Sequence, residues 1–164
     1  MKKLFITPII LLFLFNLLFN NICAQETNKI PSSADLQAVE GAIHNVFGWA
    51  VNKDFDLFFN TIAADSNFIS VTPYERIKFG AQAVKNDTAF WASPHFKAIR
   101  HELFDLHINF SNKGDVAWFY CVLDDINTWK GEPANWENTR WTGVLEKRDN
   151  KWVIVQQHFS FASE

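Results

Sequence analysis

The chain contains only two cysteines among its 164 residues, Cys23 and Cys121. Cys23 lies in the leader described below, so the remaining domain has one cysteine and no internal disulfide. Its core therefore has to hold the fold unaided. The sequence also lacks a glycine-rich phosphate loop and a Gly-x-Ser-x-Gly nucleophile elbow, so neither motif supports nucleotide binding or α/β-type serine hydrolysis.

Basic residues are neither numerous nor clustered. The formal net charge is -3, and no Lys/Arg run or basic helix stripe occurs. Nucleic-acid binding depends on neutralising phosphates, so this composition argues against a nucleic-acid partner. Aromatic residues are abundant instead, with 17 Phe and 7 Trp in the whole chain. They supply material for a core, and they favour a small apolar or aromatic ligand.

Residues 1–25 have the layout of a secretory signal peptide. Lys2 and Lys3 precede an apolar run over 4–19, and Cys23-Ala24-Gln25 forms a small-residue exit. We expect an exported protein, periplasmic or secreted, with no membrane attachment after cleavage. A membrane anchor is the alternative, but the run is interrupted at Asn16 and falls short of the roughly 20 apolar residues of a span. Lipid attachment at Cys23 is a further alternative.

Residues 26–164 have the size of one domain. The patterns predict helices over 32–52, 53–61 and 81–92, then short strands over 67–71 and 76–79. They also predict four long strands over 96–110, 115–129, 135–147 and 151–159. Because the helices are segregated from the long strands, we expect an α+β fold in which helices cover one face of a curved antiparallel sheet.

Alternation along the long strands assigns residues to faces. In the strand 96–110, Phe104 is expected to share a face with Leu106, Ile108 and Phe110. In the next strand, one face carries Trp118, Tyr120, Val122 and Asp124, and the other carries Ala117, Phe119, Cys121, Leu123 and Asp125. One of the two aspartates must therefore point inward, where burial would raise its pKa. The alternative is that both carboxylates are solvated at the strand end.

Three segments carry a family resemblance: Gly114–Phe119 (GDVAWF), Trp141–Lys147 (WTGVLEK) and Lys151–Ser160 (KWVIVQQHFS). With the order of elements, they resemble the SnoaL-like branch of the nuclear transport factor 2 (NTF2)-like superfamily over essentially all of 26–164. The resemblance implies a cystatin-like cone, in which the sheet wraps around the first helix and leaves an apolar pocket. It also implies a homodimer built by packing sheets together. It selects no activity, because the superfamily includes enzymes and non-catalytic domains.

Isomerases of this superfamily use a carboxylate near the end of the first short strand. Here the segment Phe68–Pro73 contains no Asp or Glu, which counts against isomerase activity. Cyclases of the SnoaL type place an aspartate in the region of Asp124. We therefore take Asp124, Arg140 and His158 as candidate catalytic residues, with Arg140 expected opposite His158, where the pair could polarise an oxygen. The alternative is a structural His158 and an Arg140 on the outer face.

Four aromatic residues are the candidate ligand-binding residues: Trp49, Trp91, Trp118 and Tyr120. Most other aromatic side chains are expected in the core, because a domain of this size has to bury them. We expect no metal, because successive residues on one strand face, such as those at positions 101, 105 and 107, lie about 7 Å apart. No cofactor is expected either.

Three functions remain open from the sequence. The first is a module that binds a small apolar or aromatic molecule in the cone. The second is an enzyme of the cyclase, dehydratase or hydrolase kind that uses a pocket aspartate. The third is a non-catalytic dimerisation domain whose cone is filled by its own aromatic side chains.

Overall fold

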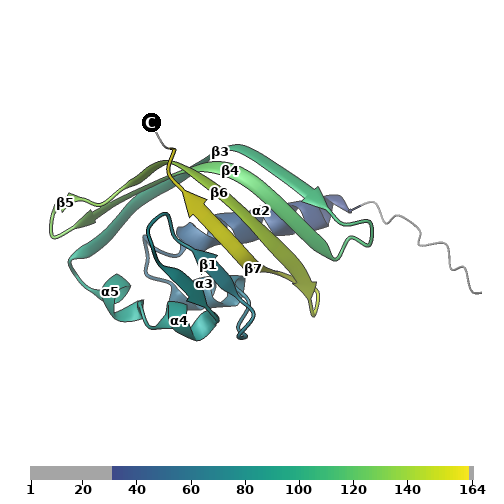
Figure 1. The fold of residues 1–164 in the computed structure, drawn as a ribbon, viewed down its shortest axis with the longest axis horizontal. Helices are drawn as coiled ribbons and strands as arrows, with labels where there is room; N and C mark the ends of the chain where they lie inside the picture. The colour runs from purple at the N-terminus through teal and green to yellow at the C-terminus, as the bar shows by residue number, and fades with distance from the viewer. Residues whose placement is uncertain (1–30, 163–164) are drawn as a thin grey trace, which may run out of the picture.

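Helices and a curled seven-stranded sheet make up the described part of the computed structural model, residues 31–162 (Figure 1). The helices are α2 (Ser33–Gly48), α3 (Phe55–Thr61), α4 (Ala81–Lys85) and α5 (Thr88–Ala92). The strands are β1 (Ile69–Val71), β2 (Ile77–Phe79), β3 (Phe96–Phe110), β4 (Val116–Trp129), β5 (Glu132–Pro133), β6 (Trp136–Arg148) and β7 (Lys151–Ser160). The predicted signal peptide lies outside the described residues. Within 31–162, no helix is long and apolar enough to cross a membrane.

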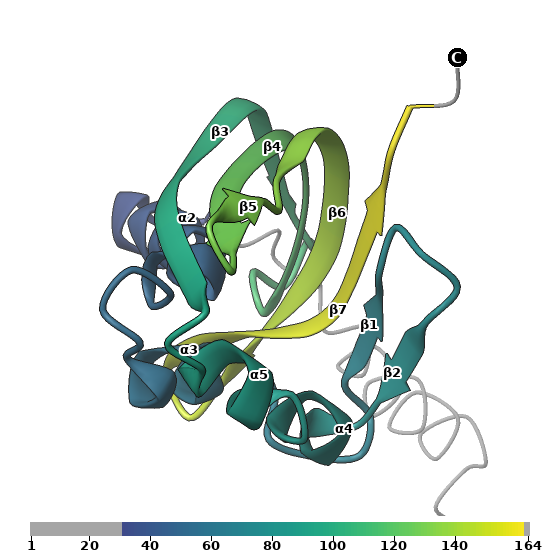
Figure 2. The ribbon, with the colours of Figure 1, turned by 90° about the vertical axis from the view of Figure 1, so that its left-hand side faces the viewer.

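The strands follow the order β2-β1-β7-β6-β4-β3, with β5 beside β4. All neighbours on this path are antiparallel except β1 and β7, which run parallel. The sheet curls into an open half-shell around α2, and α4 and α5 lie at one end of it (Figure 2). The α+β class and the cone expected from the sequence are confirmed.

The first turn of α2 is tied to the far end of the chain through Asp35. The Ser32 hydroxyl accepts the Asp35 backbone N–H at 3.1 Å and caps the helix. The Asp35 carboxylate accepts hydrogen bonds from Lys147 Nζ at 2.6 Å and Trp152 Nε1 at 3.1 Å. The Lys147 bond, with those from Ser32 and Trp152, holds the pKa of Asp35 well below 3.8.

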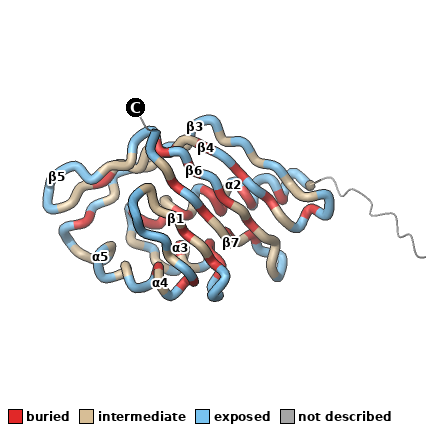
Figure 3. The backbone as a smooth tube through the Cα atoms, in the orientation of Figure 1, coloured by how far each residue is buried: buried red, intermediate tan, exposed pale blue. Residues whose placement is uncertain are grey.

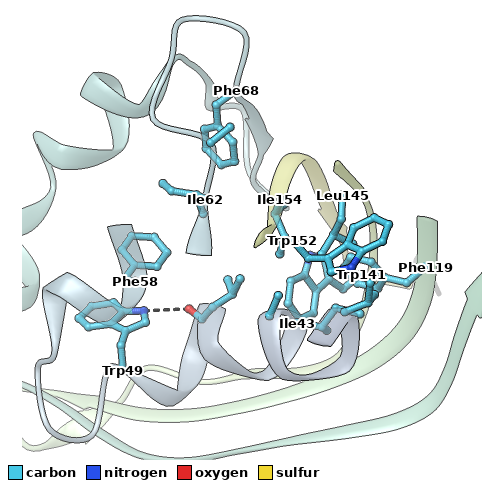
Figure 4. Close-up of a cluster of buried hydrophobic side chains, with 14 of the residues drawn as sticks. Ile43, Trp49, Phe58, Ile62, Phe68, Phe119, Trp141, Leu145, Trp152 and Ile154 are labelled. Atoms are coloured by element: carbon cyan, nitrogen blue, oxygen red, sulfur yellow. Dashed lines mark hydrogen bonds between the residues drawn. The ribbon is translucent and has the colours of Figure 1, made fainter. Parts of the chain in front are cut away.

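The buried side of α2 packs against the inner face of the sheet, and buried residues run along both (Figures 3 and 4). Trp141 is fully buried, stacks on Phe159 at 5.3 Å between ring centroids, and meets Phe119 edge to face at 4.9 Å. Beside this cluster, position 143 has room only for a glycine. A Cβ there would lie 2.5 Å from a Phe119 ring carbon and 2.9 Å from the Gln156 carbonyl oxygen.

One predicted face assignment is wrong. The pairing of β3 with β4 shifts between Phe104 and His107, where Asp105 has a φ of 50°. This bulge turns the Phe104 side chain outward, and it is 45% exposed, whereas Leu106, Ile108 and Phe110 pack against the core.

The helix predicted over 81–92 is divided into α4 and α5. The Thr88 hydroxyl donates to the Lys85 carbonyl at 2.6 Å. The Thr88 hydroxyl thus occupies a carbonyl that would accept a backbone N–H in a continuous helix, which favours a break in the helix at Asn86 and Asp87.

Candidate functional site

A cavity of about 930 Å³ opens between the end of α2, the inner face of the sheet and the short helices α4 and α5. This volume lies in the range of small-molecule sites. Aromatic side chains provide much of its wall: Phe47, Trp49, Phe58, Tyr74, Phe90, Trp91, Phe96, Trp136 and Phe159. As many polar or charged residues contribute to the wall: Ser70, Thr72, Arg76, Lys78, Asp87, Asp125, Asn127, Asn135 and Gln157.

The aromatic part of the wall is packed around Trp49, which directly follows α2. Its indole N–H donates to the Val46 carbonyl at 2.8 Å (Figure 4), which satisfies its polar group. Its ring stacks on Phe58 at 5.1 Å and meets Trp91 edge to face at 5.4 Å. Two of the four predicted ligand-binding residues, Trp49 and Trp91, therefore stand together in the cavity wall.

The other two predicted ligand-binding residues lie elsewhere. Trp118 and Tyr120 are 45% and 38% exposed on the outer face of β4. Alternation along the strand points their neighbours Phe119 and Cys121 inward, where both are buried. The expectation that Trp118 and Tyr120 line the cavity is therefore corrected: they face away from it.

Asp125 is the aspartate of the pair that faces the cavity. Asn127 Nδ2 donates to its Oδ2 at 2.7 Å. Burial raises the pKa of Asp125 to about 6, and the hydrogen bond from Asn127 opposes this shift only in part. Asp124 does not line the cavity; its carboxylate accepts the backbone N–H of Asn138 at 2.8 Å.

Arg140 and His158 are exposed, and neither lines the cavity. The expectation that they face each other is wrong, because Arg140 pairs with Ser160 and His158 with Thr142. Two local features move the register. The turn contains only two residues, at 149 and 150, both with positive φ, and a bulge follows between positions 144 and 145. The predicted trio of Asp124, Arg140 and His158 therefore does not converge in the cavity.

Several polar residues of the cavity wall were not among the site residues that we expected from the sequence. Lys78 forms an ion pair with Asp87, and burial, followed by the charge of Arg76, lowers the pKa of Lys78. On the adjoining strands, Gln157 Nε2 donates to Ser70 Oγ at 3.1 Å. The register could not be foreseen, because β1 pairs with a strand far away in the sequence.

Two buried acceptors in this wall have no hydrogen-bond partner among the described residues: Asn127 Oδ1 and Gln157 Oε1. Leaving a buried polar atom unpaired costs about 1–3 kcal/mol. Asn127 could have been noticed from the sequence, because it lies two residues after Asp125 and so shares its face.

The described residues contain no group of three or more His, Cys, Asp or Glu side chains arranged to hold a metal ion. The bulge in β3 also separates the histidines considered earlier. His101 lies 3.4 Å from His44 of α2, whereas His107 is exposed beside Tyr120 of β4.

Solved structures place this architecture among NTF2-like folds. A protein of unknown function from Prochlorococcus marinus matches with a TM-score of 0.63 and 18% identity, over 81% of this chain and 95% of its own. A proposed dehydratase of the NTF2-like family from Streptomyces avermitilis matches with a TM-score of 0.65 and 16% identity, over 80% and 98%. A proposed Ca/calmodulin-dependent kinase II association domain from Exiguobacterium sibiricum matches with a TM-score of 0.65 and 8% identity, over 83% and 99%. At these identities the likeness concerns the fold alone.

The sequence assigns the chain to one family within this fold class. The profile of the SnoaL-like domain family matches residues 39–164, so the chain belongs to that family, as its three motif segments led us to expect. None of the curated proteins matches the chain.

Proposed function

We propose that this domain binds a small, largely apolar or aromatic molecule in its cavity. The observation that carries the proposal is the composition of the cavity wall. Aromatic rings line a space of about 930 Å³, and polar side chains, Asn127 and Gln157 among them, stand between these rings. Apolar walls with a few placed polar groups are typical of small-molecule sites. A cone filled by its own side chains is less favoured, because this space remains open.

Native mass spectrometry of the purified protein tests this proposal through a retained ligand. Trp91→Ala removes a ring from the cavity wall and is expected to reduce ligand retention, whereas Leu36→Ala, at an exposed position of α2 outside the cavity lining, is expected to leave it unchanged. A protein that carries no small molecule, and whose tryptophan fluorescence responds to no aromatic compound, would contradict the proposal.

A second candidate function is proton-transfer catalysis of the cyclase, dehydratase or hydrolase kind, with Asp125 as the acid or base. The favouring observation is a cavity carboxyl with a pKa of about 6. Near neutral pH such a group occurs in both forms, so it can accept a proton from a substrate and return it. The Streptomyces avermitilis neighbour is itself named as a proposed dehydratase, which is in keeping with this candidate function.

Turnover of the retained compound, once identified, would test the catalytic role. Asp125→Asn is expected to reduce the rate by about 100-fold or more. Asp124→Asn is the matched control, because it changes the adjacent carboxyl on the outer face. Equal turnover of Asp125→Asn and the wild type would rule out this candidate function.

We further propose that the protein forms a homodimer through the outer face of its sheet. Phe104, Trp118 and Tyr120 are each more than a third exposed on the neighbouring strands β3 and β4, and exposed apolar patches often mark interfaces. Trp118→Lys should then convert a dimer into a monomer in light scattering. A wild-type mass equal to one chain at all concentrations would contradict this proposal.

Export also remains a proposal, supported by the layout of residues 1–25. The ligand would then be met outside the cytoplasm. Expression with and without residues 1–25, followed by fractionation, would test it, since only the longer chain should leave the cytoplasm.

A further inference from the structure

We propose that the ligand of this cavity is an anion, whose carboxylate or similar oxyanion is bound by Arg76 at the cavity mouth. The inference rests on the proposed function and deepens it, because it names the chemical class of the ligand. The ligand would combine an apolar or aromatic body with one negatively charged end.

Arg76 is held at the cavity by its own backbone. It directly precedes β2, and its carbonyl accepts the Thr72 backbone N–H at 3.2 Å and the Thr72 hydroxyl at 3.0 Å. These bonds close the connection between β1 and β2, and both residues line the cavity. The guanidinium forms no ion pair with any residue in 31–162. Arg76 thus brings a positive charge that has no ion-pair partner among the described residues to a wall rich in aromatic rings.

The neighbouring charges do not neutralise Arg76. The carboxylate of Asp87 is already paired with Lys78. Lys78 itself interacts unfavourably with Arg76, which contributes to the lowering of the pKa of Lys78. Asp125, on β4, accepts a hydrogen bond from Asn127. An incoming anion near Arg76 would therefore relieve a repulsion between two cations rather than compete with an existing pair.

The surroundings of Arg76 also define how such a ligand would lie. A carboxylate can take two parallel hydrogen bonds from a guanidinium, which fixes its orientation. Tyr74, which precedes Arg76 by two residues, meets Trp136 edge to face at 6.2 Å. The anionic end would thus lie at the mouth, beside Arg76 and Tyr74, and the apolar body would extend toward Trp49 and Trp91. The anion is not expected at Asp125, because two carboxylates would repel each other.

Naphthalene-2-carboxylate and naphthalene-2-carboxamide are matched probes that differ chiefly in charge. Their binding to the full protein can be followed by tryptophan fluorescence and calorimetry at low salt. We expect the carboxylate to bind about tenfold or more tighter than the amide, since a hydrogen bond to a charged group is the stronger kind. Arg76→Gln should abolish this preference while leaving the affinity for the amide unchanged. Arg140→Gln, which removes an outer-face guanidinium, is the control and should retain it.

The possible outcomes separate this inference from the proposed function. Equal affinity for both probes, or equal weakening of both by Arg76→Gln, would overturn the anion inference and leave the cavity as an aromatic site. If neither probe binds the wild type, both the inference and the proposed function are contradicted. Amide binding to Arg76→Gln also reports that the variant has folded with its cavity intact.

Discussion

The variant Asp125→Asn tests whether the Asp125 carboxyl in the cavity wall lowers the stability of the fold. Burial raises the pKa of Asp125 from 3.8 to about 6. In the unfolded chain the ordinary value applies, so between about pH 4 and 6 the folded state keeps a proton that the unfolded state has lost. The free energy of unfolding therefore falls as the pH rises through this window.

The size of the effect follows from the same two values. One pKa unit corresponds to about 1.4 kcal/mol, so the ionised Asp125 costs the fold about 3 kcal/mol near neutral pH. Asparagine has nearly the same shape, carries no charge and can still accept the hydrogen bond from Asn127. We expect Asp125→Asn to raise the free energy of unfolding by about 1–3 kcal/mol at pH 7.5 and to have little effect at pH 4.

Urea unfolding followed by tryptophan fluorescence provides the measurement, at several pH values from 4 to 7.5. Asp124→Asn is the control, because Asp124 lies outside the cavity lining and its side chain serves the Asn138 N–H. We expect no gain in stability at pH 7.5 from this variant. A gain for Asp125→Asn that is the same at pH 4 and pH 7.5, or a loss at pH 7.5, would refute the reasoning.

Further predictions concern the core and the cap of α2. Gly143→Ala should lower the free energy of unfolding by about 1–3 kcal/mol, because the added Cβ would overlap a packed ring. Gly41→Ala should raise it by up to about 1 kcal/mol, because a Cβ at this helical position meets no atom within 4 Å. Equal effects of the two variants in urea unfolding would contradict this contrast. Asp35→Asn should lower the Tm above pH 3.8, because a carboxylate with a lowered pKa stabilises the fold above that pH. This stabilisation is lost as the pH falls, so the Tm of the variant should decrease less on acidification than that of the wild type. Identical curves of Tm against pH for the two proteins would contradict this prediction. Burial raises the pKa of Cys121 to about 12. An alkylating reagent should therefore modify this thiol far more slowly in the folded than in the denatured chain, as measured by peptide mass mapping. Rapid modification of the native protein would contradict the burial of Cys121.

The sequence predicted the fold well where regular patterns are long. The two faces of β4 follow from alternation between Ala117 and Leu123, and the structure buries the expected set. The family resemblance added the cone, in which the sheet wraps around the first helix. Departures from the predicted faces and pairings occur at bulges and turns. Asp105 and Asn138, both with a φ of 50°, mark two shifts in pairing. Asn and Asp adopt this conformation more readily than most residues, but their presence alone does not identify a bulge.

The candidate site was less predictable for a related reason. Trp49 and Trp91 could be proposed from the density of aromatic residues around them. Arg76 and Lys78, by contrast, lie on or beside a strand of three residues, too short for any pattern to assign a face. Their place in the cavity depends on the parallel pairing of β1 with β7, which joins segments about 87 residues apart. No local signal in a single sequence specifies such a contact.

The position of the aspartate pair connects stability with function. Asp124 serves a backbone N–H at the edge of a bulge, which gives it a structural reason to be a carboxylate. Asp125 has no comparable reason. Its main partner is the side chain of Asn127, a neighbour in the same wall. A neutral residue of the same shape would fill this place at lower cost to the fold near neutral pH. Stability alone therefore does not account for Asp125, whereas the proposed role toward a bound molecule would account for it. The pH dependence of Asp125→Asn measures how large the cost is.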